Sequence, residues 1–200
     1  MTMPVSQIIQ KSVLRNLLRN VPRTLSLGLL GSLIVATPLL AAEKPAHPAA
    51  HDASASAALV QAVRNGTRQY VDVNVATAAG YGPFLGCVAG TDHGAMGIHY
   101  INGALVANLT LDPAQPQALI YEPNNGKMTL VGVEFILDAA SWLAANNNTP
   151  PVLDGQVFNF VPAPNRFGVN SFFELHVWAW RDNPQGSFVD WNNVVTCEKQ

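Results

Sequence analysis

The spacing of hydrophobic residues changes at Gly80. Between residues 57 and 79, apolar side chains recur every three, four or seven positions, which is typical of an α-helix. These side chains are Leu59, Val63, Tyr70, Val73 and Ala76. The spacing predicts one helix over 57–79, ended by Gly80 and with Asn65-Gly66 as a candidate break. Residues 71–75 also alternate as a strand would, and that alternative stays open.

Beyond Pro83, glycine and proline separate short apolar runs about every ten to twenty residues, which is typical of an antiparallel sheet or barrel. The candidate strands are residues 96–102, 118–122, 128–137, 156–161 and 172–181. Residues 122–127 have the turn chemistry of a hairpin, so the strands that flank them are expected to pair. A short helix is expected over 138–145. The pattern predicts an α+β fold in residues 58–200, a single domain with an N-terminal helix packed on a mainly antiparallel sheet or small open barrel.

The N-terminus predicts export from the cytoplasm. Residues 1–23 carry four basic and no acidic side chains, and residues 24–42 are uncharged and rich in leucine. A basic segment followed by an apolar one is typical of a signal peptide, with cleavage expected after Ala42. An uncleaved anchor is the alternative, but the glycines and proline inside the run favour removal. Residues 43–57, which are small and proline-containing, are predicted to be a flexible linker, and the mature protein is expected in the periplasm or outside the cell with no membrane segment.

Cleavage changes the charge of the chain. It removes four of the 11 basic residues and none of the 13 acidic residues, which leaves 7 against 13 and a net charge of −6. The remaining basic residues are scattered singly, so they form no stripe that follows a phosphate backbone. Nucleic acid is therefore not expected to be a partner.

Two cysteines, Cys87 and Cys197, lie in the mature region. An even number of cysteines in an exported protein predicts a disulfide. They lack the close spacing of a metal-binding pair, and two buried free thiols are the alternative. The bridge would tie the C-terminus to the segment after the first helix. The turn-rich residues 181–193 would then be held where they can close over the face of the preceding strand.

Strand 172–181 has two unlike faces, because side chains alternate along a strand. Phe173, Leu175, Val177 and Ala179 form an apolar face that is expected to join the core. The opposite face combines an imidazole and a carboxylate with large rings: Phe172, Glu174, His176, Trp178 and Trp180. That composition is typical of the wall of a cavity.

Further titratable residues interrupt other apolar strands. Glu134 is the only charged residue in 130–137, Glu122 ends the run 118–122, and His99 lies in 96–102. An ionised carboxylate buried alone would cost several kcal/mol, so each acid needs a partner or a cation. His99, His176, Glu122 and Glu134 thus form a candidate ligand set for zinc, iron, manganese or copper, in an enzyme or a metal carrier.

Plainer interpretations stay open. The histidines are alternatively satisfied core residues, and the acids alternatively pair with Arg166 or Arg181. A non-catalytic binding domain is the second hypothesis, with Tyr100, Glu174, Trp178 and Trp180 lining a pocket for a small molecule or glycan. Metal-free acid/base catalysis by Glu122 and Glu134 is the third, and it requires only that the two carboxyl groups lie close together. The sequence has no Gly-x-Ser-x-Gly and no phosphate-binding glycine loop.

Several motifs carry a resemblance to a known family. They are Gly94-Ala95-Met96-Gly97-Ile98-His99-Tyr100, Leu119-Ile120-Tyr121-Glu122, Leu130-Val131-Gly132-Val133-Glu134 and Leu175-His176-Val177-Trp178-Ala179-Trp180, with Asn183-Pro184, Gly186, Phe188 and Cys197. Over about residues 70–197 the chain resembles a family of uncharacterised secreted bacterial proteins, except that Asn192-Asn193 replaces the Asn-Pro expected after Trp191. The resemblance implies export but no activity, cofactor or catalytic residue.

Overall fold

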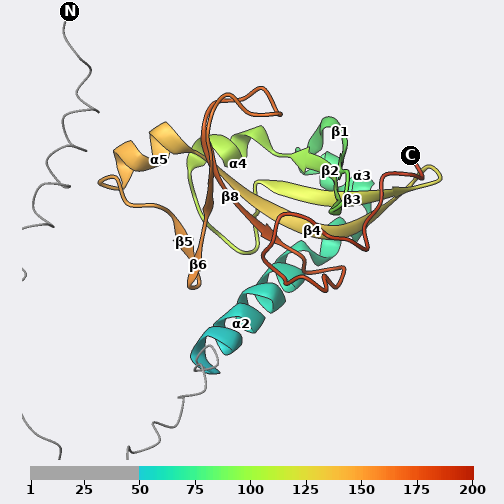
Figure 1. Cartoon of the computed structure of the whole chain (residues 1–200), viewed down its shortest axis with the longest axis horizontal. Coiled ribbons are helices and arrows are strands. Elements are labelled where there is room, and N and C mark those ends of the chain that lie inside the picture. The colour runs from blue at the N-terminus through green and yellow to red at the C-terminus, as the bar shows by residue number, and fades with distance from the viewer. Residues whose placement is uncertain (1–49) are drawn as a thin grey trace, which may run out of the picture. The chain divides into compact units, whose positions relative to one another are not determined.

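The computed structural model describes residues 50–200, with side-chain burial from residue 56 onward (Figure 1). The predicted signal peptide over 1–42 lies outside the described residues, as does the first part of the predicted linker. Within the described part of the chain, no helix has the length and apolar character needed to cross a membrane.

The N-terminal helical segment has three parts: α2 (Ala50–Thr67), the 3₁₀ turn η1 (Arg68–Val71) and α3 (Val73–Ala78). Helix α2 begins inside the predicted linker, where alanine favours a helix. It ends at Thr67, one residue after the predicted break at Asn65-Gly66, and Gly66 also permits close packing, because a Cβ atom there would clash with Ala114. A second break falls at Asp72, whose side chain accepts a hydrogen bond from the Asn74 amide and caps α3.

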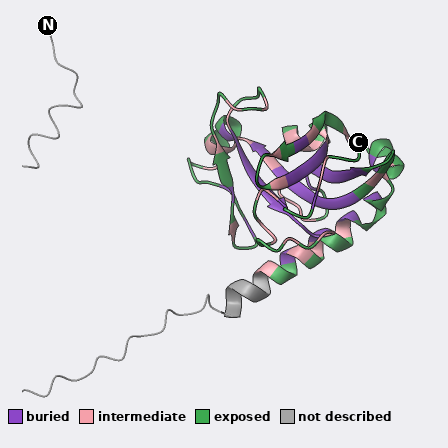
Figure 2. Ribbon diagram, turned by 45° about the vertical axis from the view of Figure 1, so that its right-hand side comes forward, coloured by how far each residue is buried: buried purple, intermediate pink, exposed green. Residues whose placement is uncertain are grey.

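The main sheet has six antiparallel strands in the spatial order β1-β2-β3-β4-β8-β7, and it curls around one face (Figure 2). Its strands are β1 (Gly82–Gly90), β2 (Gly94–Ile101), β3 (Ala118–Asn124), β4 (Lys127–Asp138), β8 (Phe172–Val177) and β7 (Asn159–Val161). Two short strands, β5 (Val152–Leu153) and β6 (Gln156–Val157), pair separately. With helices α4 (Gly103–Asn108) and α5 (Ala139–Ala145), this confirms the predicted α+β class.

The predicted hairpin is confirmed. β3 and β4 are joined through Asn125 and Gly126, both with positive φ, as a two-residue hairpin turn requires. The pairing register places Glu122 opposite Thr129 and Glu134 opposite Ala118. The two acids therefore lie at opposite ends of the hairpin and do not form the carboxyl pair expected of neighbouring strands.

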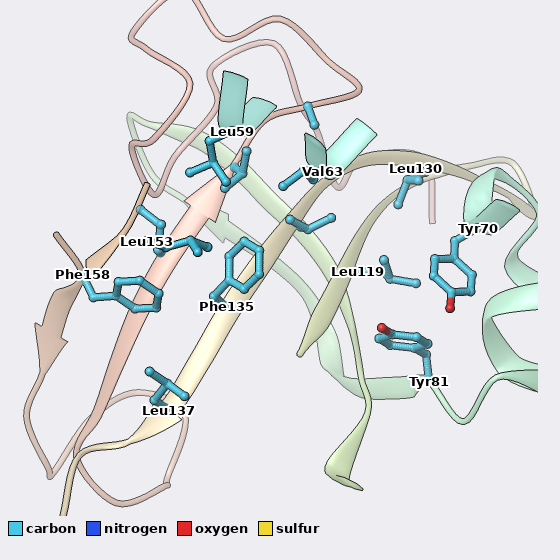
Figure 3. Packing of buried hydrophobic residues seen from close by; sticks show 14 of the residues in the cluster. Leu59, Val63, Tyr70, Tyr81, Leu119, Leu130, Phe135, Leu137, Leu153 and Phe158 are labelled. Atoms are coloured by element: carbon cyan, nitrogen blue, oxygen red, sulfur yellow. The ribbon is translucent and has the colours of Figure 1, made fainter. Parts of the chain in front are cut away.

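The larger hydrophobic core covers one face of the sheet, against the N-terminal helical segment (Figure 3). Leu59 and Val63 of α2 are fully buried there against sheet residues such as Phe135. The apolar face predicted for strand 172–181 belongs to this core and is confirmed: Phe173, Leu175, Val177 and Ala179. The opposite side chains of the same strand are therefore on the other face of the sheet.

The C-terminal segment, residues 178–200 after β8, is tied to β1 by the Cys87–Cys197 disulfide, which confirms the predicted bridge. This segment also pairs with β2 through backbone hydrogen bonds between Ala95 and Asn192 in both directions. Val195 packs in a second, smaller buried cluster with residues of the sheet. The C-terminal segment therefore covers part of the sheet face opposite the main core.

Candidate metal centre

Three predicted ligands meet on the face opposite the main core. Glu134 of β4 and His176 of β8 are direct cross-strand partners, so their side chains lie on the same face. His99 comes from β2, with β3 between it and β4. β3 presents the small side chain of Ala118 opposite Glu134. The glutamate can therefore reach across β3, and its Oε2 lies 3.2 Å from His99 Nε2.

The cluster is compact and buried. One ligand atom from each of His99, Glu134 and His176 lies within 4.8 Å of the other two. The two imidazole rings are perpendicular, with centroids 5.8 Å apart. His176 is 1% exposed and Glu134 is 4% exposed, so water does not solvate their polar atoms freely. Two imidazoles and one carboxylate in this arrangement can hold a metal ion.

Among the residues that the structure describes, neither ring nitrogen of His176 has a hydrogen-bond partner. A neutral imidazole has one donor and one acceptor nitrogen, and a buried polar atom without a partner costs about 1–3 kcal/mol. The nearest acid to Nδ1 is Asp190, whose Oδ1 lies 3.7 Å away, beyond hydrogen-bond distance. A metal ion on one nitrogen, together with a small approach of Asp190 to the other, would satisfy the whole ring.

Burial sets the charge of the cluster. It lowers the pKa of His99 to about 3, helped by the neighbouring His176, and it also lowers the pKa of His176 to about 3. Burial raises the pKa of Glu134 well above its ordinary value, and the charge and hydrogen bond of Glu174 raise it further. Although the 3.2 Å contact between His99 and Glu134 has the geometry of an ion pair, burial disfavours the charged form of both groups.

Two acids surround this cluster. Burial and then the charge of Asp190 raise the pKa of Glu174 to about 7, and its carboxyl group shares a hydrogen bond with Glu134. Asp190 lies in the C-terminal segment, where Asn159 donates a hydrogen bond of 3.0 Å to its Oδ1. Glu174, His176 and Asp190 form a second group whose ligand atoms lie within 4.8 Å of one another. His176 is therefore common to both groups.

Glu122, the fourth predicted ligand, is not part of either group. Its Oε2 accepts a hydrogen bond of 2.6 Å from the Arg181 guanidinium, and its Oε1 accepts one of 3.0 Å from the Thr196 amide. Both oxygens are thus engaged in holding the C-terminal segment, and the alternative pairing with Arg181 is the one that forms. Asp190 was missed, because no ligand spacing in the sequence links it to His176.

A cavity of about 270 Å³ opens beside the cluster. His99, Glu134 and Glu174 line it, and most of the remaining wall is apolar. Among the four predicted pocket residues, Glu174 alone belongs to this lining. Trp178 lies instead beside the cluster, with its ring stacked at 22° on His176 and its indole N–H donating to the Val189 carbonyl.

The other two predicted pocket residues face the main core. Trp180 packs there and donates from its indole to the Thr67 hydroxyl. Tyr100 makes an edge-on contact with Tyr121. The alternation used for the prediction fails at Trp180 because β8 ends at Val177, after which the chain turns. Tyr100, Trp178 and Trp180 therefore do not line this cavity with Glu174.

Comparison with known proteins gives no match: no family model, curated protein or solved structure is similar to the chain. The candidate centre therefore stands on the chemistry and geometry of its own residues.

Proposed function

We propose that the protein binds a divalent transition metal ion through His99, Glu134 and His176. His176 carries the proposal, since it is almost completely buried and neither of its nitrogens has a hydrogen-bond partner within residues 50–200. Native proteins rarely leave buried polar atoms in this state unless water or an ion completes the site. Two imidazoles and one carboxylate beside a cavity match zinc or iron(II) sites that keep a coordination position open.

The surrounding acids support the same assignment. Asp190 is near the Nδ1 of His176, where a carboxylate would fix the tautomer and orientation of a metal-binding imidazole. Glu174 lines the cavity beside Glu134, so its carboxyl group can exchange a proton with a molecule held in the cavity. We therefore infer that the ion serves a reaction in the cavity, with Glu174 as the acid or base.

The proposed place of action is the periplasm or the exterior of the cell. The Cys87–Cys197 disulfide supports this, because such bonds persist in oxidising compartments. The basic and then apolar pattern of residues 1–42 supports export in the same direction.

A second candidate function is metal-free acid/base catalysis by Glu134 and Glu174. The observation in its favour is their shared hydrogen bond, with the pKa of both groups raised. Two close carboxyl groups that share a proton offer an acid and a base together. This pair replaces the Glu122 and Glu134 pair expected from the sequence.

Metal content tests the two functions against each other. The protein is purified from the periplasm without a histidine tag or chelator and analysed for metals beside the variants His176→Ala and His93→Ala. His93 is an exposed histidine outside the candidate centre and serves as the matched control. We expect close to one metal ion per chain in the wild type and the control, and almost none in His176→Ala. If zinc, iron(II), manganese and copper all bind the wild type more weakly than about micromolar, the metal proposal is wrong and the carboxyl pair is favoured.

A further inference from the structure

The cavity beside the candidate centre has polar groups at one end and apolar walls elsewhere. The polar end consists of His99, Glu134 and Glu174. Asp138 and Asn170 also border the cavity, but Asp138 is half-buried with one carboxylate oxygen accepting hydrogen bonds from the amide and hydroxyl of Ser141, and Asn170 is exposed. The buried polar groups of the lining are therefore concentrated at the candidate metal-binding cluster.

The walls come from two separate parts of the chain. Phe84 and Leu85 belong to β1, and Phe167 and Val169 belong to the segment before β8. Phe84, Leu85 and Val169 are 38%, 52% and 39% exposed. Apolar side chains from both segments thus border the same opening, and a ligand that enters there meets hydrocarbon before it meets the cluster.

The backbone of β1 departs from a regular strand at this position. Leu85 has a φ of 59°, in the left-handed region that a leucine rarely adopts. The pairing with β2 shifts between Phe84 and Val88, so the residues between them follow no regular register. Strained backbone of this kind is often found where a side chain is held for binding. Here it accompanies the half-exposed Leu85 on the cavity wall.

Size and chemistry restrict what the cavity can hold. About 270 Å³ is slightly below the usual range for drug-sized ligands, so the occupant is small. A glycan would bring many hydroxyl groups against an apolar wall that offers them few hydrogen bonds, and burying them there would be unfavourable. A molecule with an apolar body leaves no such groups unsatisfied.

We infer that the cavity binds a small, largely apolar molecule whose single polar head group reaches the metal ion held by His99, Glu134 and His176. This inference rests on the proposed function, and it adds the class of ligand. The head group must offer a lone pair to the metal, as a carboxylate or hydroxamate oxygen does. The hydrocarbon body lies between β1 and the segment before β8.

Straight-chain hydroxamates of increasing length provide the probe. The protein is loaded with cobalt(II), whose visible absorption changes when a head group joins its coordination, and each hydroxamate is titrated from acetohydroxamate upward. We expect the affinity to increase about fourfold with each methylene added, the factor that corresponds to about 0.8 kcal/mol for a buried methylene, until the cavity is full. An affinity that does not change along the series in cobalt-loaded protein would overturn the inference while leaving the metal site intact.

Two matched variants locate the hydrocarbon chain. Val106→Phe fills part of the cavity from α4, and Val157→Phe makes the same change at a residue that is 64% exposed and outside the cavity. We expect the gain in affinity to stop at a shorter chain in Val106→Phe, with unchanged cobalt content, and to match the wild type in Val157→Phe. Equal series in all three proteins would place the probe elsewhere and overturn the inference. A wild type that takes up no cobalt, zinc or iron(II) would overturn the proposed function as well, so the two failures are distinguishable.

Discussion

Replacing His176 with leucine tests whether its imidazole is present for a metal ion or for the fold. Leucine has a similar volume and no polar atoms. The imidazole is 1% exposed, and its two nitrogens have no hydrogen-bond partner in the described part of the chain. The substitution therefore removes two unsatisfied polar atoms and breaks no hydrogen bond. Replacing a structural histidine whose nitrogens are hydrogen-bonded would instead break those bonds and destabilise the fold.

The magnitude follows from these contacts. Each unsatisfied atom costs about 1–3 kcal/mol, and the change also loses the stacking on Trp178 and requires some repacking. We expect the metal-free His176→Leu variant to be more stable than the wild type by about 1–3 kcal/mol. Metal at 100 times its dissociation constant should then stabilise the wild type by about 2.7 kcal/mol, or about 5–10 °C in Tm, and leave the variant unchanged.

Guanidinium denaturation followed by tryptophan fluorescence measures both free energies of unfolding, with chelator and with zinc. His93→Leu is the matched control and should respond to zinc as the wild type does. A metal-free His176→Leu variant that is less stable than the wild type by more than about 1 kcal/mol would refute the reasoning, because the imidazole would then have structural partners. Equal stabilisation of the variant by zinc would place the metal elsewhere.

Three further changes test the surroundings of the centre. Asp190→Asn should weaken zinc binding about 10- to 100-fold by calorimetry, because it loses the carboxylate that lies 3.7 Å from His176 Nδ1 and would orient the metal-bound ring, whereas Asp182→Asn, an exposed change in the same segment, should have no effect. The double change Cys87→Ala/Cys197→Ala should lower the free energy of unfolding in urea by up to about 4–5 kcal/mol, since the bridge closes a loop between residues 110 positions apart; a loss below about 1 kcal/mol would contradict this. Asp138→Ala should cost about 1 kcal/mol at neutral pH through loss of the α5 cap. Because hydrogen bonds from Ser141 lower the pKa of Asp138, its contribution is complete above the ordinary value of 3.8 and lost as pH falls through the lower folded-state pKa; a deficit that persists in acid would contradict the capping role.

Local patterns in the sequence were reliable where geometry alone decides the outcome. The period of two placed Phe173, Leu175 and Val177 in the main core, because alternation is a property of any strand. The same pattern failed for Trp180, since β8 ends at Val177 and the amide of Trp180 instead donates to the Val131 carbonyl. No periodicity reveals where tertiary contacts will end a strand.

The candidate site was only partly predictable for a related reason. His99, Glu134 and His176 were recognised as polar residues in apolar strands, but their meeting depends on strand order and register. The register also explains Glu122, which belongs to the predicted hairpin yet lies at the end remote from Glu134. Asp190 lies near His176 because long-range contacts place the C-terminal segment there. The short sequence motifs around Asp190 do not predict that placement.

The separation of the three ligands along the chain has a consequence for how the protein would acquire its metal. His99, Glu134 and His176 lie on three strands and are tens of residues apart, so no two of these three ligands are close enough in the unfolded chain to hold an ion in advance. Capture would therefore follow closure of the sheet, unlike in small zinc domains, where binding and folding are one event. Because the affinity of a nitrogen and oxygen site follows the same general order of divalent ions in most proteins, the ion acquired would depend on which ions are available where the chain completes its folding. The compartment in which the chain folds would then decide which metal ion the site holds.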